Sequence, residues 1–390
     1  MKILYVSPYP PAEDGIGTYT CCLAQAVRER GHDIRVVVPH PVPSATTDVL
    51  GAIDLRGSES AELREMIAKW DPDVVHVQFA VAAFGTRTLT LLRWLGALRH
   101  DIAVPVVATL HEVTSDTALL RAAGRIIYRR LVARCEQVIV HTHTAHGALI
   151  RIGGIPNSKA VVIPHPSARP PAGESTPQDL RRRFNLGDAR ILLAFGFIHV
   201  DKGLDDLVRA LKILRRTGAA RLDNVRIVVA GAVRPRQGLF RVFEFRDRLY
   251  RASVLRQARR ASVSQYLALT GYVPEDDVTA WFEAAEAVVL PYRRTEQSGV
   301  AGLANAFAVP VLASTVGGLG EQFAGSQWTF PPRAPQCLAR VLGAFLAVGP
   351  PDRTQLTLEH PSDLASVITA TLELYSTVRR RAAREGSFVA

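Results

Sequence analysis

Short apolar runs of strand length alternate with longer stretches of helical periodicity along most of the chain. The first such unit runs from an apolar segment at Ile3–Ser7, through a Pro/Gly loop and a helix, to a second apolar segment at Ile34–Val38. In the helix we expect one buried face, formed by Cys22, Leu23, Ala26 and Val27. A strand, a helix and a strand in this order predict a βαβ unit with parallel strands.

A second unit of the same kind begins near residue 190. Its strand at Ile191–Phe195 is followed by the loop GFIHVDKG, a helix and a strand at Val225–Ala230. The helix has one apolar face, formed by Leu204, Leu207, Leu211 and Leu214. Further strands are expected at Val74–Val77, Val104–Thr109, Val138–His141, Ala160–Ile163, Tyr266–Thr270, Ala287–Pro291 and Pro310–Ala313. This alternation predicts an α/β fold with parallel sheets that helices cover on both faces.

The chain has 390 residues, which exceeds the size at which a single hydrophobic core stops growing. The Pro-rich stretch at 164–177 is the expected linker. We predict a Rossmann-like N-terminal domain at 1–170, a Rossmann-like C-terminal domain at 171–360, and a C-terminal helix at 361–390 that crosses back to the first domain. Such sheets bind ligands beyond the carboxyl ends of their strands, so we expect the site in a cleft between the domains, which closes over the ligand.

The net charge of +11 comes largely from three arginine-rich segments, at 124–134, 241–260 and 379–384. The simplest interpretation of each segment is a solvated helix face. Attraction to an anionic membrane or to an acceptor phosphate is the second interpretation. Nucleic acid is disfavoured because no recognition module accompanies the charge.

The composition and the first residues predict a cytoplasmic protein, either wholly soluble or associated with a membrane surface. No stretch approaches the roughly 18 apolar residues of a membrane-spanning helix. The start, MKILYVSPYPP, is typical of a first core strand rather than of a signal peptide. The cysteines have no CxxC spacing, and we expect buried thiols rather than zinc ligands or disulfides at Cys21, Cys22, Cys135 and Cys337.

Candidate chemistry lies in the loops that follow the strands. Gly15 and Gly17 precede the first helix and could admit a phosphate to its amide groups, although a tight turn also explains them. His111 closes a strand and could orient a sugar, although a single histidine is more often structural. Lys202, near His199 and just before Gly203, would place a cation at a helix start, although a solvated lysine is almost as good an explanation.

A fourth loop, PYRRTEQSGV, contains Glu296 and is followed by an Ala-rich helix, a strand and the loop Val316–Glu321. Its carboxylate and hydroxyls could bind sugar hydroxyls. Asp71 and Asp73 form a DxD string, but they precede the strand Val74–Val77 and so lie at the wrong end for a ligand site. We interpret that string as a turn, and we expect neither a metal site nor a cofactor.

Taken together, these segments resemble the GT-B-fold retaining glycosyltransferases of family 4 along nearly the whole chain. The residues that carry the resemblance are PYPPAEDGIGTY near the start, PDVVHVQ at 72–78, ATLHE at 108–112, FGFIHVDKGLDDLVRAL at 195–211, GYVPEDDVTAWFEAAEAVVLPY at 271–292 and SGVAGLANAFAVPVLASTVGG at 298–318. Each motif is weak by itself, whereas their order and spacing are specific. The resemblance implies two Rossmann-like domains whose parallel sheets face each other across a cleft.

The resemblance also implies roles for single residues. His111, Lys202 and Glu296 correspond to catalytic positions: the histidine contacts the donor sugar, the lysine holds the diphosphate, and the glutamate contacts the sugar hydroxyls. The positions that correspond to donor-binding residues are Gly15, Gly17, His199, Tyr272, Val273, Ser298, Gly299 and Val300. The donor would be a nucleotide-sugar, UDP-linked before GDP-linked, and the acceptor a glycan, glycolipid or small metabolite.

Three positions depart from the family pattern. The second of two glutamates usually spaced by eight is absent, because Ala304 stands there with Leu303 beside it. Phe197 replaces a usual arginine, and Ala308 replaces a common glycine. These changes keep open a degenerate protein that binds sugar-nucleotide or a partner without turnover. A sugar-nucleotide epimerase is a lesser alternative, which would need additional cleft carboxylates.

The resemblance implies a mechanism that retains the anomeric configuration. The acceptor would attack on the face from which the diphosphate departs, and the β-phosphate would accept the proton. Lys202, a helix N-terminus and glycine-loop amides would stabilise the leaving group in place of a metal ion.

Overall fold

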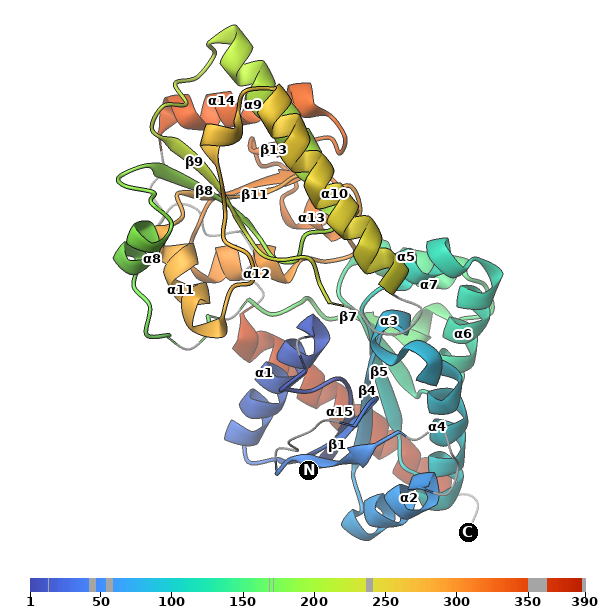
Figure 1. Cartoon of the computed structure of the whole chain (residues 1–390). Coiled ribbons are helices and arrows are strands. Elements are labelled where there is room, and N and C mark those ends of the chain that lie inside the picture. The colour runs from blue at the N-terminus through green and yellow to red at the C-terminus, as the bar shows by residue number, and fades with distance from the viewer. Residues whose placement is uncertain are drawn as a thin grey trace. The chain divides into compact units, whose positions relative to one another are not determined.

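The computed structural model describes residues 1–12, 14–41, 47–53, 59–167, 169–170, 172–235, 241–349 and 363–387. These residues form two compact units. Figure 1 labels many of their helices and strands. Unit 1 comprises Met1–His165 together with Leu364–Ala390, and unit 2 comprises Pro166–Asp363. The last segment of the chain thus belongs to the same unit as the first.

Unit 1 is built on a parallel sheet of seven described strands in the order β3-β2-β1-β4-β5-β6-β7. The strands are β1 (Lys2–Val6), β2 (Asp33–Val38), β3 (Val49–Ala52), β4 (Val74–Phe79), β5 (Val106–Leu110), β6 (Gln137–Val140) and β7 (Ala160–Val162). The helices are α1 (Gly15–Glu29), α2 (Glu59–Trp70), α3 (Val81–Phe84), α4 (Thr88–Ile102), α5 (Val113–Leu120), α6 (Ala122–Val132), α7 (His143–Arg151) and α15 (Leu364–Ser387).

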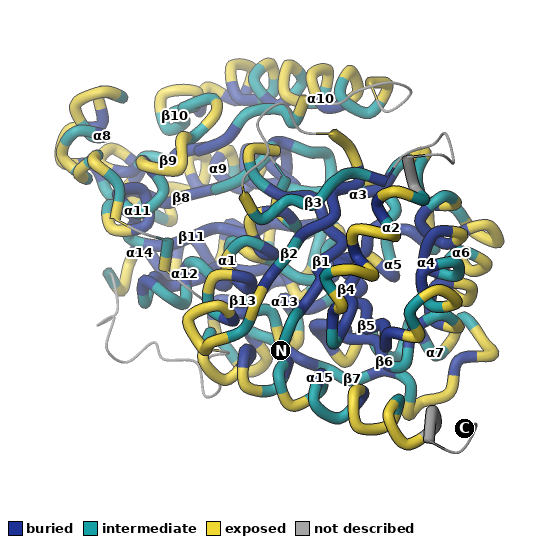
Figure 2. Tube along the Cα trace, turned by 90° about the horizontal axis from the view of Figure 1, so that it is seen from below, coloured by how far each residue is buried: buried dark blue, intermediate teal, exposed yellow. Residues whose placement is uncertain are grey.

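The two faces of this sheet carry separate hydrophobic clusters. On one face Leu91, Tyr128 and Leu149 of α4, α6 and α7 pack against alternate residues of β4, β5 and β6. On the other face α1 and α15 pack together, with Leu23 and Tyr375 in the same cluster. Figure 2 shows these central strands buried and the outer helix surfaces exposed. Because both faces are covered, β4 and β5 are buried along their whole length, which explains why apolar residues predominate in both.

Unit 2 is built on a parallel sheet of six described strands in the order β10-β9-β8-β11-β12-β13. The strands are β8 (Arg190–Phe195), β9 (Val225–Ala230), β10 (Leu267–Leu269), β11 (Ala287–Leu290), β12 (Val311–Ser314) and β13 (Thr329–Phe330). The helices are α8 (Pro177–Arg183), α9 (Leu204–Thr217), α10 (Arg241–Arg260), α11 (Glu275–Ala284), α12 (Gly299–Ala306), α13 (Gly317–Gln322) and α14 (Pro335–Val348). Helices α9, α10 and α14 cover one face, and α8, α11, α12 and α13 cover the other.

The strand predictions are confirmed in type and approximate position, but β3 and β13 were missed. Both are short edge strands, and an edge strand pairs on one side only and needs no strong apolar run. The predicted apolar face of the second βαβ helix is confirmed, since Leu204, Leu207, Leu211 and Leu214 are all buried in α9.

Two predictions about cysteines are wrong. Cys22 is exposed, because the buried face of α1 runs through Thr20, Leu23, Ala24 and Val27. Cys21 and Cys337 are partly exposed and only Cys135 is buried, although all four thiols are unlinked. A cysteine tolerates the edge of a helix face as well as the core, so its residue type alone did not decide its burial.

No helix in the described part of the chain is both long enough and apolar enough to span a membrane.

Candidate functional site

Histidines follow three neighbouring strands at the carboxyl edge of the sheet of unit 1. His111 directly follows β5, His141 directly follows β6, and His165 follows β7. The ring centres of His111 and His141 are 5.1 Å apart, and those of His141 and His165 are 5.3 Å apart. Tyr19 of α1 packs against all three rings. The parallel order of the strands brings these residues together, because the carboxyl ends of parallel strands meet at one edge.

The two buried histidines of this cluster, His111 and His141, are neutral near pH 7. Burial, with smaller contributions from His141, His165 and His76, lowers the pKa of His111 well below its ordinary value. Burial likewise lowers the pKa of His141 to about 3. Neutral imidazoles can exchange hydrogen bonds with sugar hydroxyls, whereas a permanent cation here would favour an anion.

The glycine loop lies beside β1, at the start of α1. Asp14 caps this helix by accepting hydrogen bonds from the amides of Ile16 (2.8 Å) and Gly17 (3.3 Å). A Cβ at Gly17 would lie 3.4 Å from the carbonyl oxygen of Pro8, so the helix packs closely on the segment after β1. Gly15 is exposed and a Cβ there would meet nothing within 4 Å, so its outer side has room.

In unit 2 the loop between β8 and α9 is fixed against the loop after β11. Lys202 ends a short 3₁₀ turn (Val200–Lys202), and its Nζ lies 3.7 Å from the centre of the Tyr292 ring, a cation–π contact. Gly203 has φ +67°, and a Cβ there would lie 1.9 Å from the carbonyl oxygen of Pro291. The amide of Arg293 also donates to the carbonyl oxygen of Asp201 at 2.7 Å.

A pocket opens at this carboxyl edge of the second sheet. Its lining includes Phe195, Gly196, Phe197, Lys202, Pro291 and Tyr292. The Tyr292 hydroxyl is buried and has no hydrogen-bond partner among the described residues. The pocket therefore combines an ammonium group, a buried hydroxyl and apolar walls.

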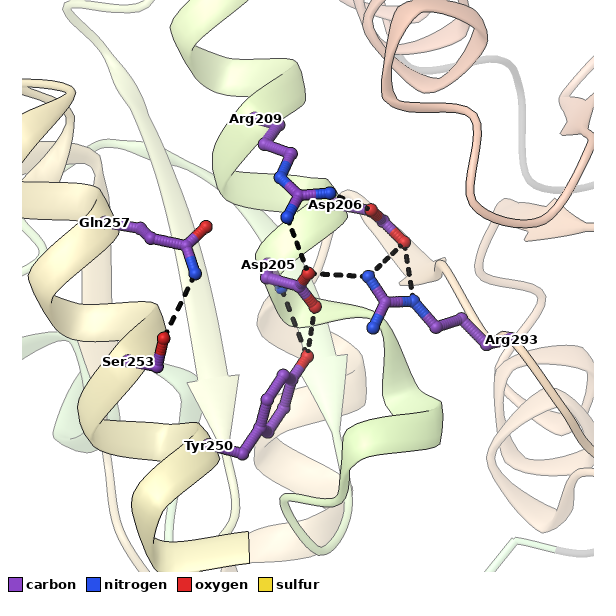
Figure 3. Close-up of polar contacts among 7 residues, drawn as sticks. All are labelled: Asp205, Asp206, Arg209, Tyr250, Ser253, Gln257 and Arg293. Atoms are coloured by element: carbon purple, nitrogen blue, oxygen red, sulfur yellow. Dashed lines mark hydrogen bonds and ion pairs between the residues drawn. The ribbon is translucent and has the colours of Figure 1, made fainter. Parts of the chain in front are cut away.

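The first turn of α9 is tied to the same loop by an ionic cluster, drawn in Figure 3. The Arg293 guanidinium donates to Asp205 at 2.6 Å and to Asp206 at 2.8 Å. Tyr250 of α10 donates to Asp205 at 2.6 Å, and Arg209 lies on the solvent side of both carboxylates. Burial alone would raise the pKa of Asp205, but the bonds from Tyr250 and Arg293 outweigh it and hold that pKa below its ordinary value. The cluster holds the Lys202 loop in place.

Glu296 lies in the loop between β11 and α12 and is 5% exposed. The next loop supports it: a Cβ at Gly317 would lie 1.8 Å from the carbonyl oxygen of Thr295, and the Gly318 amide donates to the Glu296 carbonyl oxygen at 3.0 Å. Ser298 caps α12 by accepting from the amide of Ala301 at 3.2 Å. These contacts place a carboxylate beside the start of a helix.

The remaining predicted donor-binding residues differ in their surroundings. Both ring nitrogens of His199 have polar neighbours within unit 2: the amide of Asp201 lies 3.2 Å from Nδ1 and Arg246 lies 2.8 Å from Nε2, and a neutral ring accepts a hydrogen bond from one of the two. Tyr272 is half exposed in the loop after β10, and Val273 packs against the cluster under α11. Gly299 and Val300 form the first turn of α12, where backbone amides lack intrahelical acceptors.

The DxD string lies at the opposite edge of its sheet. The Asp73 carboxylate accepts from the amide of Lys2 at 2.8 Å and pairs with Arg379 at 3.0 Å, at the amino end of β4. Among the residues that the structure describes, no group of three or more histidine, cysteine, aspartate and glutamate residues is arranged to hold a metal ion.

Comparison with known proteins places the chain in a family. Residues 14–166 match the model of Glycosyltransferase Family 4, and residues 189–347 match that of Glycosyl transferases group 1. The chain belongs to glycosyltransferase family 4. Its fold is accordingly GT-B, with two domains built on parallel sheets.

Among curated relatives, this family 4 chain is 28% identical over 237 residues to the D-inositol 3-phosphate glycosyltransferase of Kineococcus radiotolerans, a match that spans 58% of this chain. The match covers 52% of that relative, or about half of its length. The trehalose 6-phosphate synthase of Burkholderia multivorans superposes with a TM-score of 0.72 at 15% identity, over 99% of this chain and 98% of the other. HepE of Anabaena, in complex with UDP-glucose, superposes with a TM-score of 0.67 at 16% identity, over 99% of both chains.

Several residues of this family 4 site were missed from the sequence. His141 and His165 could have been found, because VIVH and VIPH each place a histidine after a strand, as ATLH does for His111. Tyr292 and Arg293 gave no comparable signal. Their contacts with Lys202 and Asp205 join segments some ninety positions apart, which no local pattern reveals.

Proposed function

We propose that this chain is a retaining, metal-independent glycosyltransferase that moves a sugar from a nucleoside-diphosphate sugar to an acceptor hydroxyl. A UDP-sugar is the favoured donor and a GDP-sugar the next. The observation that carries the proposal is the loop at Lys202, an ammonium group fixed over an aromatic ring at the mouth of a pocket at the carboxyl edge of the second sheet.

The chemistry of the leaving group explains why this loop matters. As the bond from sugar to diphosphate breaks, negative charge grows on the diphosphate and must be stabilised. Lys202 supplies a positive charge, and the amides in the first turns of α9 and α12 supply partial positive charge. In this proposal these groups do the work that a divalent cation does in metal-dependent transferases.

Residues of each unit have a proposed role in binding the donor. Glu296 would accept hydrogen bonds from sugar hydroxyls, with Ser298, Gly299 and Val300 beside it. Neutral His111 would contact the sugar near the reacting carbon, and Gly15 and Gly17 would face the phosphates and the acceptor. His199 and the segment Tyr272–Val273 would complete the donor site, the latter beside the nucleotide base.

The proposed reaction retains the anomeric configuration. The acceptor hydroxyl forms its bond to the anomeric carbon on the face from which the diphosphate leaves, and the β-phosphate takes the hydroxyl proton. The UDP-glucose bound to HepE supports the choice of a UDP-sugar. The acceptor is proposed only as a hydroxyl of a glycan, glycolipid or small metabolite.

Thermal stability in EDTA tests the donor site directly. We expect one of a panel of UDP-, GDP-, ADP- and dTDP-sugars to raise the melting temperature, because a ligand at one hundred times its dissociation constant stabilises the folded state by about 2.7 kcal/mol. Lys202→Ala should remove the shift. Lys212→Ala, an exposed lysine farther along α9, should keep it. A shift that needs metal, or that survives Lys202→Ala, would contradict the proposed donor site.

Two other functions give different outcomes. A degenerate binder would show the thermal shift without turning the donor over. An epimerase would convert the donor without any acceptor, and would need acid/base carboxylates beyond Glu296.

We also propose a cytoplasmic location with peripheral contact to an anionic membrane through α10. Val242, Phe245 and Leu249 of this helix are 71%, 63% and 54% exposed, and their spacing puts them on one face. Seven of the helix residues are arginine and two are acidic. Exposed apolar side chains among arginines match the polarity of an anionic bilayer surface, with its negative headgroups and apolar interior.

A further inference from the structure

A chain of buried hydrogen bonds runs through unit 1 from α15 to His111. The Tyr375 hydroxyl contacts the hydroxyl of Tyr5 at 3.3 Å and Nδ1 of His76. His76 Nε2 contacts Thr109 Oγ1 at 2.8 Å and the Gln78 amide nitrogen at 3.4 Å. The Gln78 carbonyl oxygen, in turn, lies 2.9 Å from Nε2 of His111. Every side chain in this chain of bonds is buried.

The orientation of the Gln78 amide sets the donor at each step along these bonds. Burial lowers the pKa of His76 to about 3, so its ring carries one proton. The Gln78 amide nitrogen can only donate, so His76 Nε2 must accept and the proton of His76 stands on Nδ1, where it is donated to Tyr375. The Gln78 carbonyl can only accept, so the bond to His111 needs a proton on Nε2 of His111.

We infer that Gln78 is a positioning residue that fixes His111 as the tautomer with its proton on Nε2 and, through its amide nitrogen, fixes His76 as the tautomer with its proton on Nδ1. In this tautomer Nδ1 of His111 carries a lone pair and acts as a hydrogen-bond acceptor. If the amide of Gln78 were reversed, His76 and His111 would both have to change tautomer with it. The two rings are therefore coupled through one glutamine.

This inference rests on the proposed function only for its kinetic consequence. A hydroxyl of the bound sugar would donate to His111, and a ring in the other tautomer would meet it with an N–H group instead. Loss of one such hydrogen bond costs about 1.4 kcal/mol, or roughly a tenfold loss of turnover.

Nuclear magnetic resonance of the ligand-free full chain, labelled with ¹⁵N in histidine, tests the inference without any assay of function. The His111 signal is identified by its loss in His111→Ala. We expect a protonated Nε2 and an unprotonated Nδ1 in the wild type. A proton on Nδ1, or an even mixture of tautomers, would overturn the inference whether or not any variant folds.

Two substitutions at Gln78 distinguish an effect on the His111 tautomer from a merely structural role of the glutamine. Gln78→Met removes the acceptor and should let His111 populate both tautomers, with donor turnover reduced roughly tenfold. Gln78→Glu keeps an acceptor but adds a charge, so it should preserve the Nε2 proton and raise the pKa of His111 relative to the wild type. Among the described residues, His76, His141, His165 and Tyr19 also lie near His111, and all four are unchanged in both variants.

Gln137→Met is the matched control, because Gln137 is a buried glutamine of β6, two strands away from β4 in the same sheet, and it donates instead to the Ser158 carbonyl at 2.7 Å. It should leave the His111 signals in place. Identical His111 signals in Gln78→Met and in the wild type would contradict the inference. Failure of the wild type to turn over any donor would sink the proposed function and leave the tautomer result standing.

Discussion

Both the backbone conformation and the close packing at position 203 require a glycine. Its φ of +67° lies in the left-handed region, and a Cβ would lie 1.9 Å from the carbonyl oxygen of Pro291. The lysine before it therefore lies in a loop that packs against the segment directly after β11. The sequence showed the lysine and the glycine side by side, but not the strand end that makes the glycine necessary.

Gly203→Ala should destabilise the chain by about 3 kcal/mol or more, because the left-handed conformation costs about 1–2 kcal/mol and the clash adds to it. Gly218→Ala is the control at the other end of α9: its φ is +63°, but a Cβ there meets nothing within 4 Å. It should cost only about 1–2 kcal/mol. Urea unfolding measures both, and equal losses would show that the contact with Pro291 carries no energetic weight.

Among the elements, α9 and the loop after β11 depend on the ionic cluster of Figure 3. Arg293 is 16% exposed, and its two carboxylate partners are 8% and 4% exposed. If the guanidinium were removed, water could not solvate these buried carboxylates well, so its loss would destabilise the fold. Arg209 pairs with the same carboxylates but is 52% exposed. The two arginines therefore form a matched pair that differs mainly in burial.

Arg293→Met should cost about 3 kcal/mol at pH 7, because it leaves two adjacent carboxylates without their buried counter-charge. Arg209→Met should cost less than about 1 kcal/mol. The pKa of Asp205 is lowered in the folded state, so its contribution is present above the unfolded value of 3.8 and is lost as the pH falls through the folded value. Urea unfolding should show the Arg293→Met deficit shrinking below about pH 4. A deficit independent of pH would rule out an ionic origin.

Helix α10, which Figure 1 shows as one long helix, should bind an anionic membrane through its exposed apolar face. The protein should co-sediment with phosphatidylglycerol vesicles but not with phosphatidylcholine vesicles, and salt should weaken the binding. Phe245→Ser with Leu249→Ser should reduce it several-fold. Leu119→Ser, on α5 and 62% exposed, should not. Unchanged binding of the double variant would exclude α10 as the contact.

Sequence and structure agree best where the signal is local. The central strands and the apolar face of α9 follow from periodicity, because each is set by burial on known faces. Cys22 was misplaced because it lies at the margin of the buried face of α1. The bond between His76 and Tyr375 joins residues 299 positions apart, so only the packed unit reveals it.

In the whole molecule, each of the two units has its own hydrophobic cores and its own set of candidate site residues. Unit 1 uses both ends of the chain, because α15 supplies Val367, Tyr375 and Val378 to the same core as β1. Unit 2 has its own pair of cores on either side of its sheet. The buried histidines lie in the first unit and the Lys202 pocket in the second, so the proposed reaction draws on residues of both.

Release of UDP from a panel of UDP-sugars in EDTA, with and without candidate hydroxyl acceptors, tests the central claim most directly. We predict that the wild type and Lys212→Ala release UDP from one donor, faster when a suitable acceptor is present. Lys202→Ala should be slower by roughly a hundredfold or more, as when one preorganised transition-state donor is lost. Tight binding of a UDP-sugar by the wild type with no release under any condition would contradict the account and leave a binding protein in its place.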